Sequence, residues 1–193
     1  TTTSLGNFLF CKEYKGEIMK LREIANKDER NVIKRTLPQA TISGVFSPTR
    51  AKNNLSQHSG LICVDIDAKD NPEIKDWERL KQDLSMLPQI AYCALSVSGK
   101  GLFVIIPLRY PQKHLLQFRQ LQMDFSKMGI VIDQACSDIT RLRCLSYDEH
   151  PIISEDATLY KGVYVEKPKY HSFHPYLIYK GENTLAEVAA CCR

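Results

Sequence analysis

Leu61-Ile62-Cys63-Val64-Asp65-Ile66-Asp67 is the stretch that decides the fold, because it joins an apolar run of strand length to two acids. Ser59-Gly60 precedes the run and Asp70-Asn71-Pro72 follows it, as is typical of a buried central strand. Successive strand side chains point to opposite faces, so Asp65 and Asp67 project from the same face near the strand's end. Such a pair offers hard oxygen ligands to Mg²⁺ or Mn²⁺. The alternative is that Asp67 merely opens a turn.

Length and composition are typical of one globular domain, or of one domain with a tail. The 193 residues are 44% hydrophobic and 25% charged, and a net charge of +4 is compatible with a polyanionic partner without requiring one. The seven cysteines form no CxxC pair, which predicts reduced thiols and a cytoplasmic protein. No apolar run approaches the roughly 18 residues of a membrane span, so no membrane partner is expected.

Patterns of apolar residues on both sides of the acidic stretch predict an α+β fold. Helices are expected over 17–35, with a possible break at 26–28, and over 76–87 and 112–128. Strands are expected within 1–11 and over 40–46, 61–67, 90–95, 102–108, 130–133 and 142–147. We expect residues 1–160 to form the functional domain. Residues 161–193 are expected to be a linker and the start of a C-terminal extension, with a weak helix over 184–192.

A turn rich in serine, glycine and lysine, Ser96-Val97-Ser98-Gly99-Lys100-Gly101, is expected to join two of these strands into a hairpin. Its glycines permit positive φ, its successive N–H groups can form an anion-binding nest, and Lys100 adds a charge suited to phosphate. It is not a Walker A loop, because the G-x-x-x-x-G-K-[ST] spacing is absent and a strand follows. An ordinary hairpin turn is the alternative.

A third carboxylate, Asp133, ends the short apolar run before it and repeats the pattern of the first strand. Arg141 follows in Asp138-Ile139-Thr140-Arg141, where it could hold a phosphate or pair with Asp138. The histidines show neither HxH nor HExxH spacing, so neither a zinc site nor a histidine-centred hydrolase is expected.

With Asp65-Ile66-Asp67, the stretch from Ser96 to Leu102, and Ile132-Asp133 in this order, the chain resembles the primase-polymerase (prim-pol) domains of the archaeo-eukaryotic primase superfamily. More closely, it resembles the N-terminal domain of virulence-associated protein E-like proteins of bacterial mobile elements. The resemblance spans about Lys34 to Asp156. It implies two αβ lobes, one similar to an RNA-recognition motif (RRM), whose mixed or antiparallel sheets form a central cleft.

The resemblance also implies nucleotidyl transfer in replication of a mobile element. A nucleic-acid 3′-oxygen would attack the α-phosphorus of a nucleoside triphosphate on a single-stranded DNA template, aided by two Mg²⁺ or Mn²⁺ ions. A helicase domain or subunit would be a partner. The implied catalytic metal ligands are Asp65, Asp67 and Asp133. The implied nucleotide-binding residues are Ser98, Gly99, Lys100, Gly101 and Arg141.

Phe103 departs from the pattern of the resemblance, because active members carry a histidine just after the serine-glycine turn. Phenylalanine cannot donate to a phosphate, so either Lys100 and a nearby basic residue substitute for the histidine, or catalysis is weak or altered. Two other functions therefore stay open. One is a catalytically weak or inactive module that binds nucleic acid or nucleotide and supports a helicase. The other is a metal-dependent nuclease, in which the turn would have no role.

Overall fold

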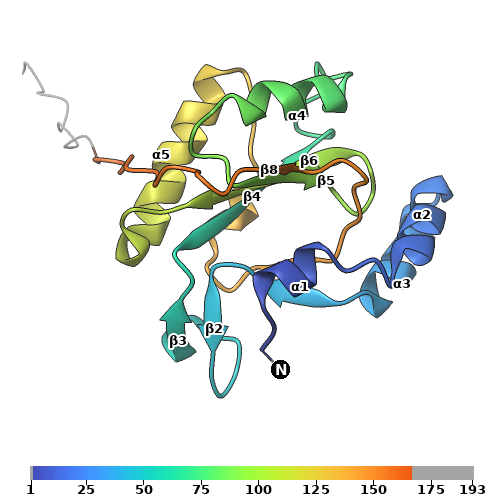
Figure 1. Cartoon of the computed structure of the whole chain (residues 1–193), viewed down its shortest axis with the longest axis horizontal. Coiled ribbons are helices and arrows are strands. Elements are labelled where there is room, and N and C mark those ends of the chain that lie inside the picture. Colours follow the sequence, from blue (N-terminus) through green and yellow to red (C-terminus); the bar gives the residue numbers. More distant parts are fainter. Residues whose placement is uncertain (1, 167–193) are drawn as a thin grey trace, which may run out of the picture.

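The computed structural model describes residues 2–166 and confirms the predicted α+β class with antiparallel sheets. The expected helix over 184–192, and all but the first six residues of the expected linker and extension, lie outside the described residues. The central sheet has four antiparallel strands in the order β4–β6–β5–β8 (Figure 1). Their bounds are Leu61–Asp67 for β4, Gly101–Pro107 for β6, Tyr92–Leu95 for β5 and Ile152–Ile153 for β8.

Two helices, α4 (Trp77–Ser85) and α5 (His114–Lys127), cover one face of the sheet; in Figure 1 α4 lies above the strands and α5 at their left. The alternation of β4 explains this, since its fully buried Ile62, Val64 and Ile66 all point toward these helices. They form one core with apolar residues of both helices, among them Leu84, Phe118, Leu121 and Phe125. The alternate residues of β4, including both acids, therefore face the opposite side.

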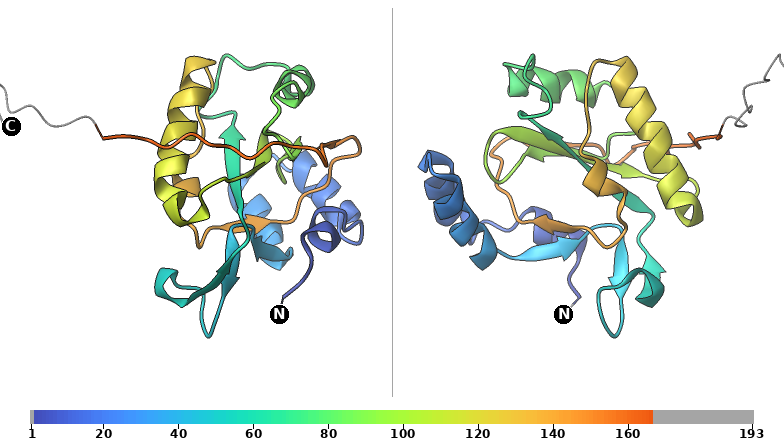
Figure 2. Two further views of the ribbon diagram at one scale, coloured as in Figure 1. Left: turned by 60° about the vertical axis from the view of Figure 1, so that its left-hand side comes forward. Right: turned by 180° about the vertical axis from the view of Figure 1, so that it is seen from behind.

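The opposite side is covered by the first part of the chain and by a small sheet (Figure 2). The helices here are α1 (Leu5–Leu9), α2 (Lys15–Glu23) and α3 (Lys27–Thr36). The small sheet pairs β1 (Gln39–Thr41) with β7 (Leu142–Cys144), while β2 (Gly44–Phe46) and β3 (Leu55–His58) form a projecting hairpin. Short 3₁₀ helices cover Lys52–Asn54, Pro111–Lys113 and Gln134–Ser137, named η1, η2 and η3. A second core joins Phe8, Ile18, Leu21 and Leu145 to Phe103 of β6.

Three predicted elements differ in the structure. The strand expected within 1–11 is helix α1, whose start Ser4 caps by accepting a hydrogen bond from the Asn7 N–H. The strand expected over 40–46 is divided into β1 and β2, because the two parts pair with different strands. The expected 130–133 strand is not a regular strand, although the Asp133 N–H donates to the Asp65 carbonyl at 2.8 Å. That bond places Asp133 beside β4.

A buried ion pair connects α4 to the segment after β7. Lys81 of α4 is 1% exposed, and its Nζ lies 2.9 Å from Oδ2 of Asp148 and 2.9 Å from a carboxylate oxygen of Glu78. The same Asp148 oxygen accepts the Leu95 N–H at 2.8 Å. Asp148 therefore fixes the end of β5, where the serine-glycine turn begins.

A pair of histidines connects β3 to the start of α5. His58 Nδ1 accepts the Gly60 N–H at 2.9 Å, so the proton of this ring lies on Nε2, which is 3.2 Å from His114 Nδ1. His114 then carries its own proton on Nε2, which is buried and has no hydrogen-bond partner within residues 2–166. Burial lowers the pKa of both histidines, and burial together with the nearby His58 lowers that of His114 to about 4.

Acid is therefore expected to destabilise the protein before its carboxylates titrate. His114 stays neutral in the folded state down to about pH 4, whereas its unfolded form binds a proton below about pH 6.5. The free energy of unfolding should thus fall by about 2 kcal/mol between pH 7.5 and pH 5 from this group. Urea unfolding at both pH values measures the change. His114→Phe should flatten the dependence and the exposed His150→Gln should preserve it; an equal slope in all three proteins contradicts the assignment.

None of the helices within residues 2–166 has the combined length and apolarity needed to cross a bilayer.

Candidate metal centre

Asp65 forms a buried ion pair with Arg143 on the face of the sheet opposite α4 and α5. Asp65 lies directly across from Phe103 in the β4–β6 ladder, and Oδ1 of Asp65 accepts a hydrogen bond from Nη1 of Arg143. The Arg143 guanidinium also lies 4.2 Å from the centroid of the Phe103 ring. Burial lowers the pKa of Arg143, and its Nε makes no hydrogen bond in the described part of the chain. Removing the Asp65 charge would leave this guanidinium buried without a counter-ion.

Asp133 and Cys136 complete a cluster around the second oxygen of Asp65. Nη2 of Arg141 bridges the two acids, at 2.8 Å from Oδ2 of Asp133 and 3.5 Å from Oδ2 of Asp65. The Cys136 thiol, from η3, donates to the same Asp65 oxygen at 3.7 Å. One ligand atom each of Asp65, Asp133 and Cys136 lies within 4.8 Å of the others.

This three-residue group, which we call the Asp-Asp-Cys cluster, could hold a metal ion. Metal–oxygen bonds are near 2–2.5 Å, so ligand atoms on one ion are at most about 4–5 Å apart. The cluster is close to that limit. Arg141 now lies between the carboxylates, but its side chain is 39% exposed and can turn toward solvent. Arg143 is held more tightly, because only 9% of its side chain is exposed. An entering ion would therefore compete with Arg141.

Asp67, expected from sequence to share an ion with Asp65, lies outside the Asp-Asp-Cys cluster. It ends β4 opposite Gly101, and its Oδ2 is 3.9 Å from Nζ of Lys69. Burial raises the pKa of the Asp67 carboxyl, the Lys69 charge opposes that shift, and the Asp133 charge adds to it. The Asp133 carboxylate is therefore close enough to influence the ionisation of Asp67.

The serine-glycine turn lies at the same end of β4 as Asp67, as a β5–β6 hairpin turn. A Cβ atom on Gly101 would clash with the Ile66 carbonyl oxygen, so the close approach of the two strands requires glycine. Gly99 has a φ of 66°, and Lys100 is exposed. In the described residues, the backbone N–H groups of Val97, Ser98 and Lys100 donate no hydrogen bond. They remain available to an anion.

Arg22 of α2 fixes the turn from its carbonyl side. Its guanidinium donates to the Ser96 carbonyl at 3.1 Å, to the Val97 carbonyl at 3.4 Å and to the Tyr147 carbonyl at 2.6 Å. With these carbonyl groups engaged, the turn has a fixed shape and its free N–H groups have fixed directions. Free N–H groups on a turn held in this way could bind an anion without first having to be ordered.

The structure brings most of the predicted site residues to one end of β4. Asp65, Asp133 and Arg141 are in direct contact, and the turn lies beside Asp67. The sequence did not indicate Cys136 or Arg143, and Lys34 stood out only as one of several basic residues in 17–35 that are more often solvated surface than phosphate contacts. Cys136 and Arg143 contact Asp65, and Lys34 of α3 is half-buried and has a pKa lowered by burial, which the charge of Asp67 partly opposes. The spacing of Arg141, just before β7, and Arg143, within it, was a usable signal for two cations at one site.

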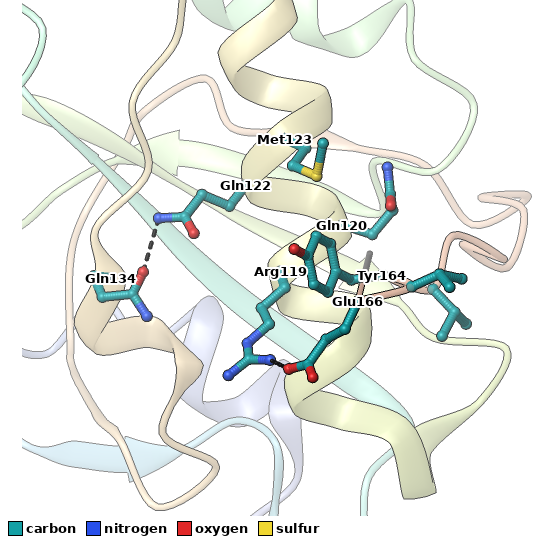
Figure 3. A pocket seen from close by; sticks show the side chains of 9 residues that line it. Arg119, Gln120, Gln122, Met123, Gln134, Tyr164 and Glu166 are labelled. Atoms are coloured by element: carbon teal, nitrogen blue, oxygen red, sulfur yellow. Dashed lines mark hydrogen bonds and ion pairs between the residues drawn. The ribbon is translucent and has the colours of Figure 1, made fainter. Parts of the chain in front are cut away.

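A sizeable pocket lies elsewhere in the described part of the chain. It lies between α5 and the segment 163–166, with a volume of about 870 Å³, and neither Asp65 nor Asp133 lines it (Figure 3). Arg119 and Glu166 form an ion pair of 2.8 Å in this pocket, and Gln122 bonds to Gln134 at 2.8 Å. These polar groups of the pocket therefore pair with each other. Near Asp65, by contrast, the buried Nε of Arg143 has no hydrogen-bond partner within residues 2–166.

A family model described as BT4734-like, N-terminal domain, matches residues 32–152, which is more than half of the chain. The family is a different one from the virulence-associated protein E-like proteins, so the resemblance to those proteins is wrong. The shared motifs are short, and other sequences can carry an Asp-x-Asp strand end and a serine-glycine turn. No curated protein and no solved structure matches the chain.

Proposed function

The chain belongs to the BT4734-like N-terminal domain family, and for this domain we propose metal-dependent nucleotidyl transfer from a nucleoside triphosphate to a nucleic-acid 3′ end. One observation supports this most strongly. A cluster able to hold a cation lies at the same end of β4 as a rigid turn with free N–H groups and a lysine. Phosphoryl chemistry needs both, since ions steady the reacting oxygens while N–H groups bind the remaining phosphates.

Asp65 and Asp133 would hold one ion, and Asp67 would be a ligand of a second. Carboxylate ligands suit Mg²⁺ and Mn²⁺ alike, whereas the softer sulfur of Cys136 favours Mn²⁺. When bound, the ions would stabilise the attacking and leaving oxygens of the transferred nucleotide. This set of ligands adds Cys136 to the three acids predicted from sequence.

Arg141 would have two positions in this reaction. Without a metal it neutralises Asp133 and Asp65. An ion entering between those carboxylates would replace it, and the freed guanidinium would then face the phosphates of the bound nucleotide. Arg143 would stay with Asp65 on the Phe103 ring, so the basic group near Phe103 is this arginine. Ser98, Gly99, Lys100 and Gly101 would cradle the triphosphate.

The order of elements supports an RRM-like lobe with the site on its open face. The chain runs β4–α4–β5–β6–α5 with both helices on one face, and residues 130–133 return to lie beside β4. The remaining elements around α1–α3 and the β1–β7 sheet would form the second lobe. The partners proposed are nucleoside triphosphates, a single-stranded DNA template and a helicase domain or subunit.

A second function is favoured by the two arginines. Arg141 and Arg143 already neutralise Asp65, so a domain that never exchanged Arg141 for a metal would bind nucleotide or nucleic acid without catalysis. The same turn and basic side chains would serve that role. The two functions differ in one measurable respect, which is metal-dependent transfer.

Extension of a labelled primer on a single-stranded template, with Mn²⁺ or Mg²⁺, tests the proposal. The wild-type protein should incorporate nucleotide, and Asp65→Asn combined with Asp67→Asn should lose incorporation by on the order of 100-fold or more. Asparagine keeps an oxygen that can accept from Arg143 but removes the counter-ion of this arginine, so urea unfolding of the variant is measured beside its activity and transfer is compared under conditions in which it is folded. The exposed Asp83→Asn on α4 is the matched control.

The two functions give different outcomes in this assay. Transfer that survives the double substitution excludes these acids as ligands. Template binding by the wild type, with no transfer in either metal, assigns the domain to the binding module instead.

A further inference from the structure

A second cavity, of about 410 Å³, lies where the segment after α1 meets residues 147–153. This volume is in the range of small-molecule sites. Neither Asp65 nor Asp133 lines the cavity, and none of the residues predicted from sequence to bind a nucleotide does so. The proposed reaction therefore leaves it without a role.

Aromatic rings form much of its wall. Phe10 is 51% exposed, and its ring meets that of Tyr92 edge-on with centroids 6.1 Å apart. Tyr147 lines the same cavity, and Nζ of Lys15 lies 4.6 Å from the centroid of its ring. Rings gathered at an opening, one of them half exposed, are typical of surfaces on which nucleic-acid bases stack.

Charged side chains of both signs surround these rings. Lys12 lines the cavity and Lys15 lies at Tyr147, so two exposed cations are at the rim. Glu149, also exposed, adds an acceptor. Most of the Tyr92 side chain is buried, but its hydroxyl is not among the enclosed polar atoms that lack a partner in residues 2–166, so it can reach the solvent in the cavity. Burial raises the pKa of this phenol, so it remains a donor.

Direct contacts connect the cavity to the candidate metal centre. The Tyr92 ring lies 5.5 Å from the Phe103 ring, which in turn holds Arg143 against Asp65. On the other side, Arg22 binds the Tyr147 carbonyl together with the Ser96 carbonyl of the turn. A nucleic acid in the cavity would contact Tyr92 and Tyr147, which are connected to the metal centre through Phe103 and to the turn through Arg22.

We propose that this cavity binds one nucleobase of a single-stranded nucleic acid, stacked against Phe10 and Tyr147. Lys12 and Lys15 pair with the flanking phosphates. Glu149 accepts from the exocyclic amino group of the base, which cytosine and adenine have and thymine lacks. The inference names where the nucleic-acid partner of the proposed function binds, and it therefore rests on that function.

Fluorescence anisotropy of short labelled strands tests the cavity without requiring catalysis. Phe10→Ala should weaken binding of an oligo-dC strand roughly 5- to 150-fold, the range found when one stacking ring is removed. Lys12→Glu should weaken binding and lower its salt dependence. The wild type should prefer oligo-dC to oligo-dT, and Glu149→Gln should reduce that preference. Met86→Ala and Lys75→Glu, near the two ends of α4, are the matched controls and should bind as the wild type does.

The outcomes separate this inference from the proposed function. Unchanged strand binding in Phe10→Ala and Lys12→Glu overturns the inference, even if the Asp65 and Asp67 variant abolishes transfer. Weakened strand binding in these variants supports it, even if the wild type transfers no nucleotide in any metal. Titration with cytidine monophosphate distinguishes the ligand's source: if Phe10→Ala weakens only the mononucleotide, the cavity takes free nucleotides and the assignment to a strand is wrong.

Discussion

Asp133→Asn is expected to lower Mn²⁺ affinity and nucleotide transfer by on the order of 100-fold while the protein stays folded. The substitution removes one negative ligand from the Asp-Asp-Cys cluster and leaves Arg141 with a single acidic partner, Asp65. Asparagine keeps the oxygen that accepts the Ala135 N–H at the start of η3, so the local backbone should not change. Loss of metal binding would thus report ligation rather than unfolding.

Titration of Mn²⁺ by electron paramagnetic resonance measures the affinity, because free and bound ions give different signals. Primer extension on the same samples measures transfer. Asp83→Asn, which changes an exposed carboxylate on α4, should leave both quantities unchanged. If Asp133→Asn binds Mn²⁺ as tightly as the wild type, the ion uses other ligands and the Asp-Asp-Cys cluster is not the metal site.

Lys81→Met is expected to lower the free energy of unfolding by about 3–5 kcal/mol, because it leaves Asp148 charged and buried beside an apolar side chain. The N–H groups of Leu95 and His150 would still donate to this carboxylate, but they carry no full charge. Urea unfolding near neutral pH measures the loss. The end of β5 should become the least protected part of the sheet in hydrogen exchange.

A matched control for Lys81 lies on the same helix. Arg79 and Asp83 form an exposed pair of 3.1 Å, so Arg79→Met should cost under about 1 kcal/mol. Equal effects of the two substitutions would mean that burial adds nothing to the Lys81–Asp148 pair. A further variant that changes Lys81 to Met and Asp148 to Leu should recover much of the loss, since a well-packed apolar pair can replace a buried ion pair.

The local pattern of β4 was sufficient to predict its strand, its buried face and the shared direction of Asp65 and Asp67. It was not sufficient to predict which acids would be close together. Neighbours two apart on one strand are separated by about 6.6 Å along it, whereas residues on adjacent segments are about 4.5–5.5 Å apart. Asp133, which runs beside Asp65, therefore joins the Asp-Asp-Cys cluster, and Asp67 does not.

The contacts of Cys136, Arg143 and Arg22 could not be predicted for a related reason. Each joins segments more than 70 residues apart, and short-range periodicity carries no information about such pairs. The first helix was missed because Phe8, Leu9 and Phe10 resemble a strand, while the cap at Ser4 and packing on the sheet favour a helix. The resemblance to virulence-associated protein E-like proteins was wrong because it relied on short motifs alone.

The attachment of Arg22 to the turn has a practical consequence for anyone who trims the chain. The family match starts at residue 32, but α1 and α2 lie before it and supply Phe8, Ile18 and Leu21 to the core under Phe103. A fragment cloned to the boundaries of the match would expose that core and leave the turn carbonyls without their donor. The cooperative folding unit is therefore longer than the stretch by which the family is recognised, and expression should begin upstream of α1.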